Sequence, residues 1–365
     1  MKGIILAGGY ATRLRPISYA LPKLLFPVLG KPMIYWTLDL LRRYGVDEVV
    51  LAVNYLADVL RARVGEEYKG IRIHYSLEDS PLGTGGPLKL ASHTIRMRDT
   101  FVAMNGDVIA EIDLTQMLDS HEIAKAAVTD ALHEVHDPTR FGVVQLDSRR
   151  RISRFVEKPS LKEAPSRLVN AGIYMIEPSV LRMIPEGRKV SLEREIFPVL
   201  AKRQTLIGFP FEGHWFDIGS FSDFQKANFA LLQKQRPKLI IRHGRRGIVK
   251  DLRRTALFFK GEHSTVESTA RVGSNVVIGN NCRVGSGARV TNSILFDEVA
   301  VGNGAIVSGA IIASNVSIGK RVRIKPGTVI SSNVQISDDV KIGRNAIVHP
   351  YKEITTNVAT GIQIM

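Results

Sequence analysis

The strongest constraint on the fold is a six-residue repeat in the C-terminal part of the chain. Apolar residues recur there at every sixth position, and only the steps from Val290 to Leu295 and from Val307 to Ile312 are one residue shorter. A period of six fits neither the 3.6-residue turn of a helix nor the alternation of a strand, so it predicts a solenoid of stacked triangular coils. At three positions per coil, the fifteen ladder positions predict about five coils. The ladder consists of Val266, Val272, Ile278, Val284, Val290, Leu295, Val301, Val307, Ile312, Ile318, Ile324, Ile330, Ile336, Ile342 and Val348.

Small or branched side chains fall four positions after the first ladder residues, at Ala270, Val276, Cys282 and Ala288. We expect Cys282 to fill an inward slot and to serve packing rather than chemistry. Because it is the only cysteine, an internal disulfide is excluded, which fits a reducing cytoplasm. The repeat resembles the left-handed parallel β-helix of hexapeptide-repeat proteins.

The first 235 residues have a different pattern. Apolar runs such as GIILA and VDEVVLAV alternate with helical stretches such as IYWTLDLLRRYG. This alternation predicts a mainly parallel, Rossmann-like three-layer α/β sheet, in which ligands bind at the carboxyl ends of the strands. The predicted division is an α/β domain at 1–235, a basic connector at 236–262, the β-helix at 263–350 and a C-terminal tail at 351–365.

The chain is basic, with 50 Lys and Arg against 35 Asp and Glu and a net charge of +15. Such an excess suits nucleic acid, an anionic membrane surface or small anionic substrates. Much of it lies between Lys234 and Arg254, where few aromatic residues could stack on bases, so a solvated connector is favoured. No apolar run approaches the roughly 18 residues that cross a membrane, and the run at 3–7 is too short for a secretion signal. We therefore expect a cytoplasmic protein with no nucleic-acid or membrane partner.

The first predicted strand runs into an anion-binding segment. Gly8 and Gly9 let the backbone approach a ligand, bare N–H groups favour anions, and Arg13 can form a bidentate fork with a phosphate. Lys23 follows with no acidic residue between. The segment has neither the Gly-Lys-Ser/Thr of a Walker loop nor a G-x-G-x-x-G motif, so it predicts a phosphate cradle of another kind.

The residues LAGGYATRLRP with LPK resemble the signature G-G-x-G-T-R-L-x-P…P-K of the sugar-1-phosphate nucleotidyltransferases. The one departure is Ala11, where the signature has Gly, and a side chain there tightens the cradle. With the hexapeptide repeats and the terminal IQIM, the chain resembles those members that transfer a guanylyl group to mannose 1-phosphate. Other family segments follow in the same order: SPLGTGGPL (80–88), NGDV (105–108), FGVV (141–144), FVEKP (155–159), NAGIY (170–174) and WFDIGS (215–220).

The resemblance implies a role for each of a set of residues. Arg13, Lys23 and Lys158 are the expected catalytic cations, and Asp107 and Asp217 the expected Mg²⁺ ligands. The nucleotide is expected at Leu6, Gly8, Gly9, Glu78, Gly83 and Thr84, and the sugar at Gly142, Glu157, Asn170 and Gly172. The residues themselves support the metal pair, because Asp107 follows a predicted strand as a hard oxygen ligand. Ser220 can cap the next helix in SFSD, which leaves Asp217 for metal.

The expected chemistry needs no catalytic base. A sugar phosphate, with a second pKa of about 6, is largely dianionic at neutral pH and can itself attack the α-phosphorus of a nucleoside triphosphate. The reaction needs in-line positioning and charge neutralisation. We expect transfer from GTP to a hexose 1-phosphate, mannose 1-phosphate first, with release of pyrophosphate. The alternatives are thymidylyl or uridylyl transfer to glucose 1-phosphate, or a catalytically weak regulatory subunit that binds nucleotide sugars.

Two other possibilities are less favoured by the residues. Acyl transfer on the β-helix wants a histidine base, and only His263 and His349 lie near its ends. We expect the β-helix to support a homo-oligomer instead, since stacking covers the open ends of a solenoid. His133 and His136 flank a strand end and do not share a helical face, so a metal site is not expected there.

The choice of base is expected to depend on Glu78. In relatives that transfer thymidylyl or uridylyl groups, the matching position resembles a glutamine. A carboxylate is an acceptor only, so it suits the adjacent N1–H and N2 amino donors of guanine. The single N3–H of uracil or thymine is flanked by carbonyl groups that would repel it. The sequence therefore predicts a preference for GTP.

Overall fold

The structure is a computed structural model that describes residues 1–234, 247–251 and 256–365. The chain forms two compact units: unit 1 comprises residues 1–10 and 33–217, and unit 2 comprises residues 11–32 and 218–365. Within the predicted connector at 236–262, the structure includes strands β15 (Gly247–Asp251) and β16 (Ala256–Lys260); most of the rest lies outside the described residues. The units interleave along the sequence, so the predicted boundaries do not coincide with them.

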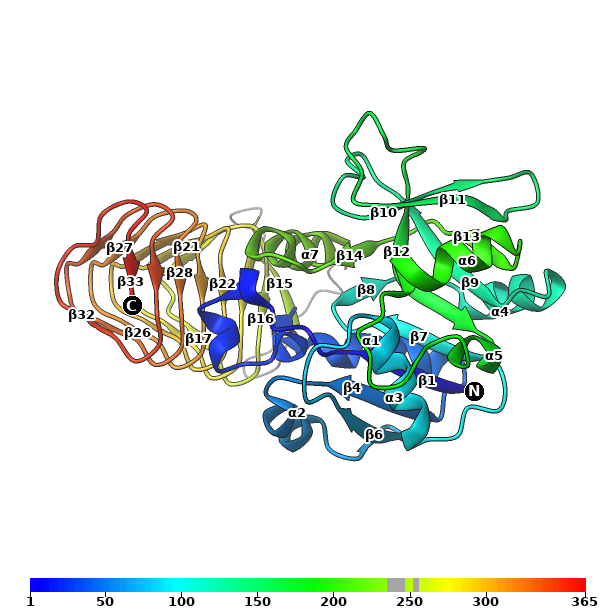
Figure 1. Cartoon of the computed structure of the whole chain (residues 1–365). Helices are drawn as coiled ribbons and strands as arrows, with labels where there is room; N and C mark the ends of the chain where they lie inside the picture. Colours follow the sequence, from blue (N-terminus) through cyan, green and yellow to red (C-terminus); the bar gives the residue numbers. More distant parts are fainter. Residues whose placement is uncertain (235–246, 252–255) are drawn as a thin grey trace. The chain divides into compact units, whose positions relative to one another are not determined.

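Unit 1 is built on a ten-stranded sheet with a main path of β11-β10-β12-β7-β1-β4-β6-β5 (Figure 1). The strands β7, β1, β4 and β6 are mutually parallel, whereas β12 runs antiparallel to β7, β9 and β10. This arrangement confirms the predicted α/β class, with an antiparallel part around β12. The strands are β1 (Lys2–Leu6), β4 (Glu48–Val53), β5 (Glu67–Tyr68), β6 (Ile71–Leu77), β7 (Phe101–Asn105), β9 (Val128–Glu134), β10 (Gly142–Leu146), β11 (Ile152–Glu157), β12 (Leu168–Ile176) and β13 (Leu206–Pro210), with β8 (Val108–Ala110) and β14 (Trp215–Asp217) paired separately.

The helices of unit 1 follow from amphipathic spacing and capping. In α1 (Met33–Arg43), Met33, Ile34, Leu38 and Leu41 are buried along one face, and the helix ends in two arginines that suit its negative C-terminal end. Asp113 caps α4 (Leu114–Ile123) by accepting hydrogen bonds from two backbone N–H groups. The remaining helices are α2 (Ala57–Val64), α3 (Gly85–Thr94), α5 (Pro178–Leu181), α6 (Phe197–Lys202) and the short η4 (Leu192–Ile196). No helix among the described residues is long and apolar enough to span a membrane.

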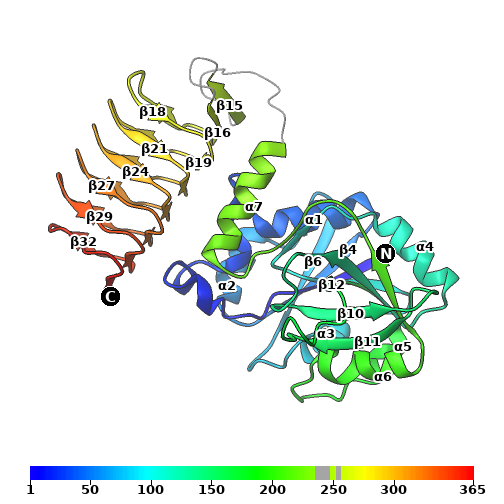
Figure 2. The ribbon, with the colours of Figure 1, turned by 90° about the horizontal axis from the view of Figure 1, so that it is seen from above.

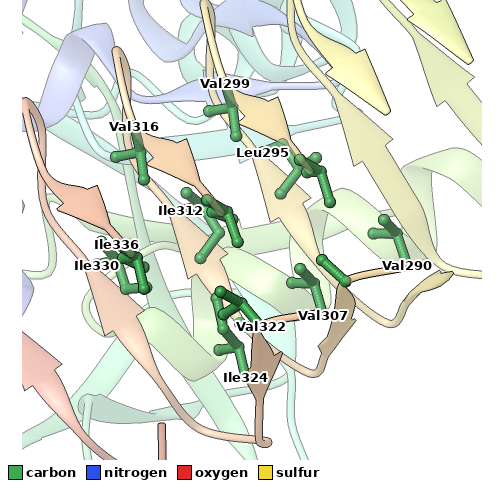
Figure 3. Packing of buried hydrophobic residues seen from close by; sticks show 14 of the residues in the cluster. Val290, Leu295, Val299, Val307, Ile312, Val316, Val322, Ile324, Ile330 and Ile336 are labelled. Carbon is green, nitrogen blue, oxygen red and sulfur yellow. The ribbon is translucent and has the colours of Figure 1, made fainter. Parts of the chain in front are cut away.

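Unit 2 contains the coils that the six-residue period predicts. Three sheets run along the coils (Figure 2), and their strands pair parallel except for the antiparallel pair β15 and β16. The ladder residues pair in register, as in Val266 with Val284 and Val284 with Val301. The ladder side chains from Val272 to Val348 are buried together inside the coils, some of them shown in Figure 3, and the half-buried Val266 packs against them. The sheets fit the predicted left-handed β-helix. Cys282 is 1% exposed, and burial raises the pKa of its thiol to about 11, which fits the expected packing role.

The first sheet, which we call sheet E, contains β15, β16, β19 (Val276–Ile278), β22 (Ile294–Leu295), β25 (Ile311–Ile312), β28 (Val329–Ile330), β31 (Ile347–Val348) and β33 (Gln363–Ile364). The second contains β17 (Thr265–Val266), β20 (Arg283–Val284), β23 (Ala300–Val301), β26 (Ser317–Ile318), β29 (Gln335–Ile336) and β32 (Glu353–Ile354). The third contains β18 (Arg271–Val272), β21 (Arg289–Thr291), β24 (Ile306–Ser308), β27 (Arg323–Ile324) and β30 (Lys341–Ile342).

The β-helix is longer than its sequence signal at both ends. The predicted tail at 351–365 forms a further coil, because β32 and β33 pair with β29 and β31. Ile354 continues the six-residue step after Val348, and the step is lost only beyond it, before Ile364. At the other end β16 pairs with β19, so sheet E begins inside the predicted connector. Several corners hold asparagine with positive φ, for example Asn275 and Asn292, since asparagine tolerates the left-handed region.

Sheet E has a second buried face. Ile294 and Ile311 precede the ladder residues and so point out of the coil, yet they are at most 2% exposed. Unit 2 also contains helix α7 (Phe221–Lys234) and the segment 11–32, with its short elements η1 (Thr12–Leu14), η2 (Ile17–Tyr19), η3 (Lys23–Leu25), β2 (Pro27–Val28) and β3 (Lys31–Pro32).

Three phenylalanines join these parts of unit 2. Phe26 of the segment, Phe224 of α7 and Phe296 of the β-helix pack edge to face, with ring centroids 5.7 to 5.9 Å apart. In addition, the Leu29 N–H donates to Asn228 Oδ1 at 2.9 Å, and Asn228 is fully buried. The segment 11–32, which carries the predicted cations Arg13 and Lys23, is therefore packed on the β-helix.

Candidate active site

The carboxyl ends of β1, β4 and β6 place Gly8, Asn54 and Glu78 side by side. The Ala7 N–H donates to Ala52 O, and the Glu78 N–H donates to Val53 O, which fixes the three strand ends in order. A Cβ at Gly8 would lie 2.5 Å from Glu78 Oε1, so only glycine fits beside this carboxylate. Gly9 has open space around it. On the other side of β1, the Leu6 carbonyl accepts from the Gly106 N–H.

Glu78 is a buried carboxylate at this edge. Its side chain is 6% exposed, and Oε2 accepts from the Leu82 N–H at 3.1 Å. Burial raises the pKa of Glu78, and the hydrogen bond from Leu82 opposes part of that rise. Among the described residues, Oε1 has no hydrogen-bond partner. The arrangement leaves one acceptor oxygen of Glu78 directed at no protein group.

The next two predicted nucleotide residues lie in a tight loop after β6. Gly83 has a φ of +82°, and a Cβ there would lie 2.3 Å from Val190 O, so the loop requires glycine. The Thr84 hydroxyl donates to Glu193 at 2.6 Å and accepts from the Leu192 N–H. Thr84 therefore fastens the loop to residues 190–193, and the structure gives its side chain a structural use that the sequence did not predict.

The predicted metal pair is brought together by a short ladder. Asp107 lies in the turn between β7 and β8, and Asp217 is the last residue of β14. Strand β14 pairs with β8 so that Asp217 lies opposite Val108, the residue after Asp107. Among the described residues no group of three or more His, Cys, Asp or Glu could hold a metal. Two carboxylates nevertheless fit Mg²⁺, which keeps several waters and takes substrate phosphates as ligands.

The predicted sugar residues gather on β10, β11 and β12. Gly142 lies directly opposite Glu157, and a Cβ at Gly142 would lie 2.9 Å from a Glu157 carboxylate oxygen. Lys158 follows with a φ of +49°, an uncommon conformation for a lysine, and its Nζ lies 3.5 Å from Glu157 Oε1. Its N–H donates to Phe141 O, which holds this strained position. The Lys158 side chain remains largely exposed.

Asn170 and Gly172 lie on a bulge in β12. Asn170 Oδ1 accepts from the Gly172 N–H at 2.7 Å, and its amide also contacts the Tyr174 hydroxyl. Gly172 has a φ of +72°, and the side chain of Asn105 occupies the space of a Cβ there. Tyr174 and Asn105 are supporting residues that the sequence did not single out, although both stand inside family segments.

Aromatic rings surround the start of β14. The Trp215 indole N–H donates to Ala171 O at 2.9 Å, and its ring contacts Phe141 and His133. His133 also packs against Phe211. His133 therefore belongs to an aromatic cluster.

The remaining predicted cations lie in unit 2. Arg13 is exposed on η1, and a Cβ at Gly219 would lie 2.9 Å from its guanidinium. Lys23 opens η3 and is half-buried. Ser220 caps α7 as predicted, since its Oγ accepts from the Asp223 N–H. Ala11, the departure from the signature, has a φ of 47° and a ψ of 42°, which is the left-handed conformation that glycine would adopt freely.

Comparison with known proteins identifies relatives of both parts of the chain. Residues 256–364 match the family described as GMPPB C-terminal domain. A mannose-1-phosphate guanyltransferase of Candida albicans is 42% identical over 229 residues, which are 61% of this chain and 62% of that protein. A mannose-1-phosphate guanylyltransferase of Mycobacterium tuberculosis is 34% identical over 302 residues, 82% of this chain and 80% of that protein.

Among solved structures, HddC from Yersinia pseudotuberculosis complexed with GMP-PN has a TM-score of 0.54 and 27% identity, and covers 63% of this chain and 99% of that one. The family that the larger part of the chain matches agrees with the one that the motif LAGGYATRLRP predicts. Residues 2–234 match the nucleotidyl transferase family, and the chain belongs to that family.

Proposed function

We propose that this chain transfers a guanylyl group from GTP to mannose 1-phosphate, forming GDP-mannose and pyrophosphate. The observation that carries the choice of base is the buried carboxylate of Glu78 beside Gly8, with one oxygen that has no partner among the described residues. The names of the Candida albicans and Mycobacterium tuberculosis relatives support the choice of sugar.

The proposed reaction is an in-line displacement. An oxygen of the sugar phosphate forms a bond to the α-phosphorus, the bond from that phosphorus to the bridging oxygen breaks, and pyrophosphate leaves with the electron pair. No proton has to be removed from the nucleophile, so the chain needs no base. Lys158 is proposed to hold the sugar phosphate, and Arg13 and Lys23 to neutralise the triphosphate.

Glu157 is proposed to accept hydrogen bonds from sugar hydroxyls. Gly142, Asn170 and Gly172 would form the floor of that pocket, because none of them leaves a bulky side chain over it. Gly9 and Gly83 are proposed to bring backbone N–H groups to the nucleotide, with Leu6 and Thr84 shaping the loops that hold them.

We propose Mg²⁺ as the cofactor, held by Asp107 and Asp217. When bound, the ion supplies charge stabilisation to the phosphates during transfer. The pairing of β14 with β8 supports this pair, because it brings the two carboxylates to one end of a two-stranded ladder.

Three wider expectations also stay proposals. These are a domain boundary near residue 235, a homo-oligomer formed through the β-helix, and a cytoplasmic location. Sedimentation of the full chain tests the oligomer, and a monomer at working concentration would contradict it.

The function is tested by a matrix of four nucleoside triphosphates against mannose, glucose and galactose 1-phosphates, with pyrophosphate release as the readout. We expect the highest kcat/KM for GTP with mannose 1-phosphate. A higher value for dTTP or UTP with glucose 1-phosphate would replace the proposal with the thymidylyl or uridylyl alternative. No turnover with any pair would favour the regulatory alternative.

A further inference from the structure

Two polar side-chain atoms at the carboxyl edge have no hydrogen-bond partner in the part of the chain that the structure describes. Among the described residues, the Nδ2 of Asn54 and the Oε1 of Glu78 are both buried and make no hydrogen bond. A buried donor or acceptor without a partner costs free energy, so such atoms need an explanation. These two are a donor and an acceptor, and both belong to residues that directly follow adjacent strands.

Both side chains converge on Gly8. A Cβ at that glycine would lie 2.5 Å from Glu78 Oε1 and 3.7 Å from Asn54 Cβ. Glu78 is 6% exposed, so its Oε1 is an acceptor without a partner among the described residues, on a side chain that is more than nine-tenths buried. The edge therefore offers a donor and an acceptor on either side of one backbone position in the nucleotide-binding loop.

We propose that the Asn54 side-chain amide is a second base-reading group, which donates a hydrogen bond to the O6 carbonyl of guanine while Glu78 accepts from N1–H and N2–H. This inference rests on the proposed function, because it names a specificity-determining residue for the same site. Guanine presents its O6 acceptor next to the N1–H and N2 donors, so one amide donor and one carboxylate match that edge in order.

The two residues exclude different bases. Adenine places an amino donor where guanine has O6, so it meets the Asn54 amide donor to donor. Uracil and thymine keep a carbonyl at that place but have a second carbonyl where guanine has N2, which faces the Glu78 carboxylate. With Nδ2 facing the base, Asn54 thus favours guanine over adenine. Glu78 favours guanine over the pyrimidines, and over adenine as well, because the adenine N1 is an acceptor.

The loops that carry these groups have a means of opening. Tyr10 follows Gly8 and Gly9, Tyr55 follows Asn54, and the two rings lie 5.9 Å apart while 43% and 39% exposed. The pair is therefore a surface contact that can separate without disturbing the core. Because the Asn54 and Glu78 atoms are buried, the loops at 8–10 and 54–56 must part when the base enters.

The test uses nucleotides that each change one group of guanine. We would measure kcat/KM with mannose 1-phosphate for GTP, for 6-thio-GTP, which replaces O6 by a poor acceptor, and for ITP, which lacks the N2 amino group. The proteins are the full chain, Asn54→Ala, Asn54→Asp and Glu78→Gln. One charge-neutral hydrogen bond corresponds to about a tenfold change.

We expect the unmodified chain to prefer GTP over 6-thio-GTP by about tenfold. Both Asn54 variants should lose this preference through a higher KM for GTP, and should keep the preference for GTP over ITP. Glu78→Gln should instead lose the preference for GTP over ITP and keep the preference for GTP over 6-thio-GTP. Asn54→Asp should also gain relative use of ATP, because its carboxylate accepts from the adenine amino group.

The inference is overturned if the unmodified chain does not discriminate between GTP and 6-thio-GTP. It is also overturned if both Asn54 variants keep the ratio of kcat/KM for GTP to kcat/KM for 6-thio-GTP that the unmodified chain shows. A lower kcat with unchanged nucleotide ratios would mark Asn54 as a structural residue and would overturn the inference as well. Failure of the proposed function is a separate result, because it appears in the unmodified chain as a preference for dTTP, UTP or ATP over GTP.

Discussion

The β-helix and the carboxyl edge of the ten-stranded sheet use their side chains in opposite ways. In the β-helix, many equivalent apolar residues pack in register, and each contributes a small share of the core. At the sheet edge, the proposed site depends on single residues such as Gly8, Glu78 and Asp107. The comparison indicates that a repeat specifies architecture through redundancy, whereas the proposed chemistry depends on individual positions.

The largest effect is expected at the carboxylates proposed for metal. Asp107→Asn and Asp217→Asn should each lower kcat by about a hundredfold or more, because the charge that stabilises the phosphates is lost. Steady-state pyrophosphate release measures this, and circular dichroism checks the fold. The matched control is Asp119→Asn, an exposed aspartate on α4, which should keep full turnover. Full turnover in both site variants would remove these residues from the mechanism.

Two buried residues of the β-helix, Phe296 and Ile324, should affect stability similarly but kcat differently. Phe296→Ala should cost about 3 to 5 kcal/mol of stability, and Ile324→Ala about 2 to 5 kcal/mol. Only Phe296 packs on Phe26 and Phe224, so only its removal should loosen the segment that carries Lys23 and lower kcat by about tenfold. Thermal unfolding and kcat are measured on both variants. Equal kcat in the two would show that the segment needs no support from the β-helix.

A third prediction concerns a buried acid inside unit 1. Asp130 is fully buried, both of its carboxylate oxygens lack a hydrogen-bond partner among the described residues, and burial raises its pKa well above the ordinary value. With a raised folded-state pKa, its contribution to stability is present below the unfolded pKa of about 3.9 and is lost as pH rises through the folded value.

Asp130→Asn removes that titration. The unfolding temperature of the variant should therefore fall less between about pH 4 and pH 8 than that of the unmodified chain. At the upper end we expect the variant to be the more stable protein, because its neutral amide has no charge to bury. Scanning calorimetry across this range gives the result, and parallel pH profiles for the two proteins would be the contrary outcome.

The smallest effect is expected at Ala11. Its left-handed backbone costs an L-residue about 1 kcal/mol, so Ala11→Gly should raise the unfolding temperature by about 2 °C. The control is Ala20→Gly in the same segment, where φ is −115° and glycine should slightly destabilise. A lower unfolding temperature in both variants would mean that glycine at position 11 does not relieve the strain.

The same contrast explains what could be predicted from sequence. The ladder was predictable residue by residue, because a period of six has one structural solution. The last coil was predicted as a tail, although Ile354 keeps the six-residue step after Val348; beyond Ile354 the step is irregular, and backbone pairing continues to Ile364 without the period. The family motifs located Gly8, Gly83 and Asp107, but periodicity gave no reason to expect residues 11–32 in the same compact unit as the β-helix.

Side-chain partners were the least predictable part of the site. Thr84 stands in a family segment, yet its hydroxyl is committed to Glu193, and only the fold brings these residues together. Asn54 was overlooked although a usable signal existed, since it directly follows the strand 48–53 at the edge where ligands bind. The predicted burial of Cys282 needed only the repeat and is confirmed.

The packing of Phe26 against Phe296 has a consequence for protein synthesis. A ribosome delivers residues in order at about 5 to 20 per second, and domains generally fold as they emerge. The segment 11–32 belongs to a unit whose other residues, 218–365, are translated after residues 33–217. Phe26 therefore emerges many seconds before its partner on the β-helix exists, and the nascent chain must keep this apolar segment from aggregating until Phe296 has been translated.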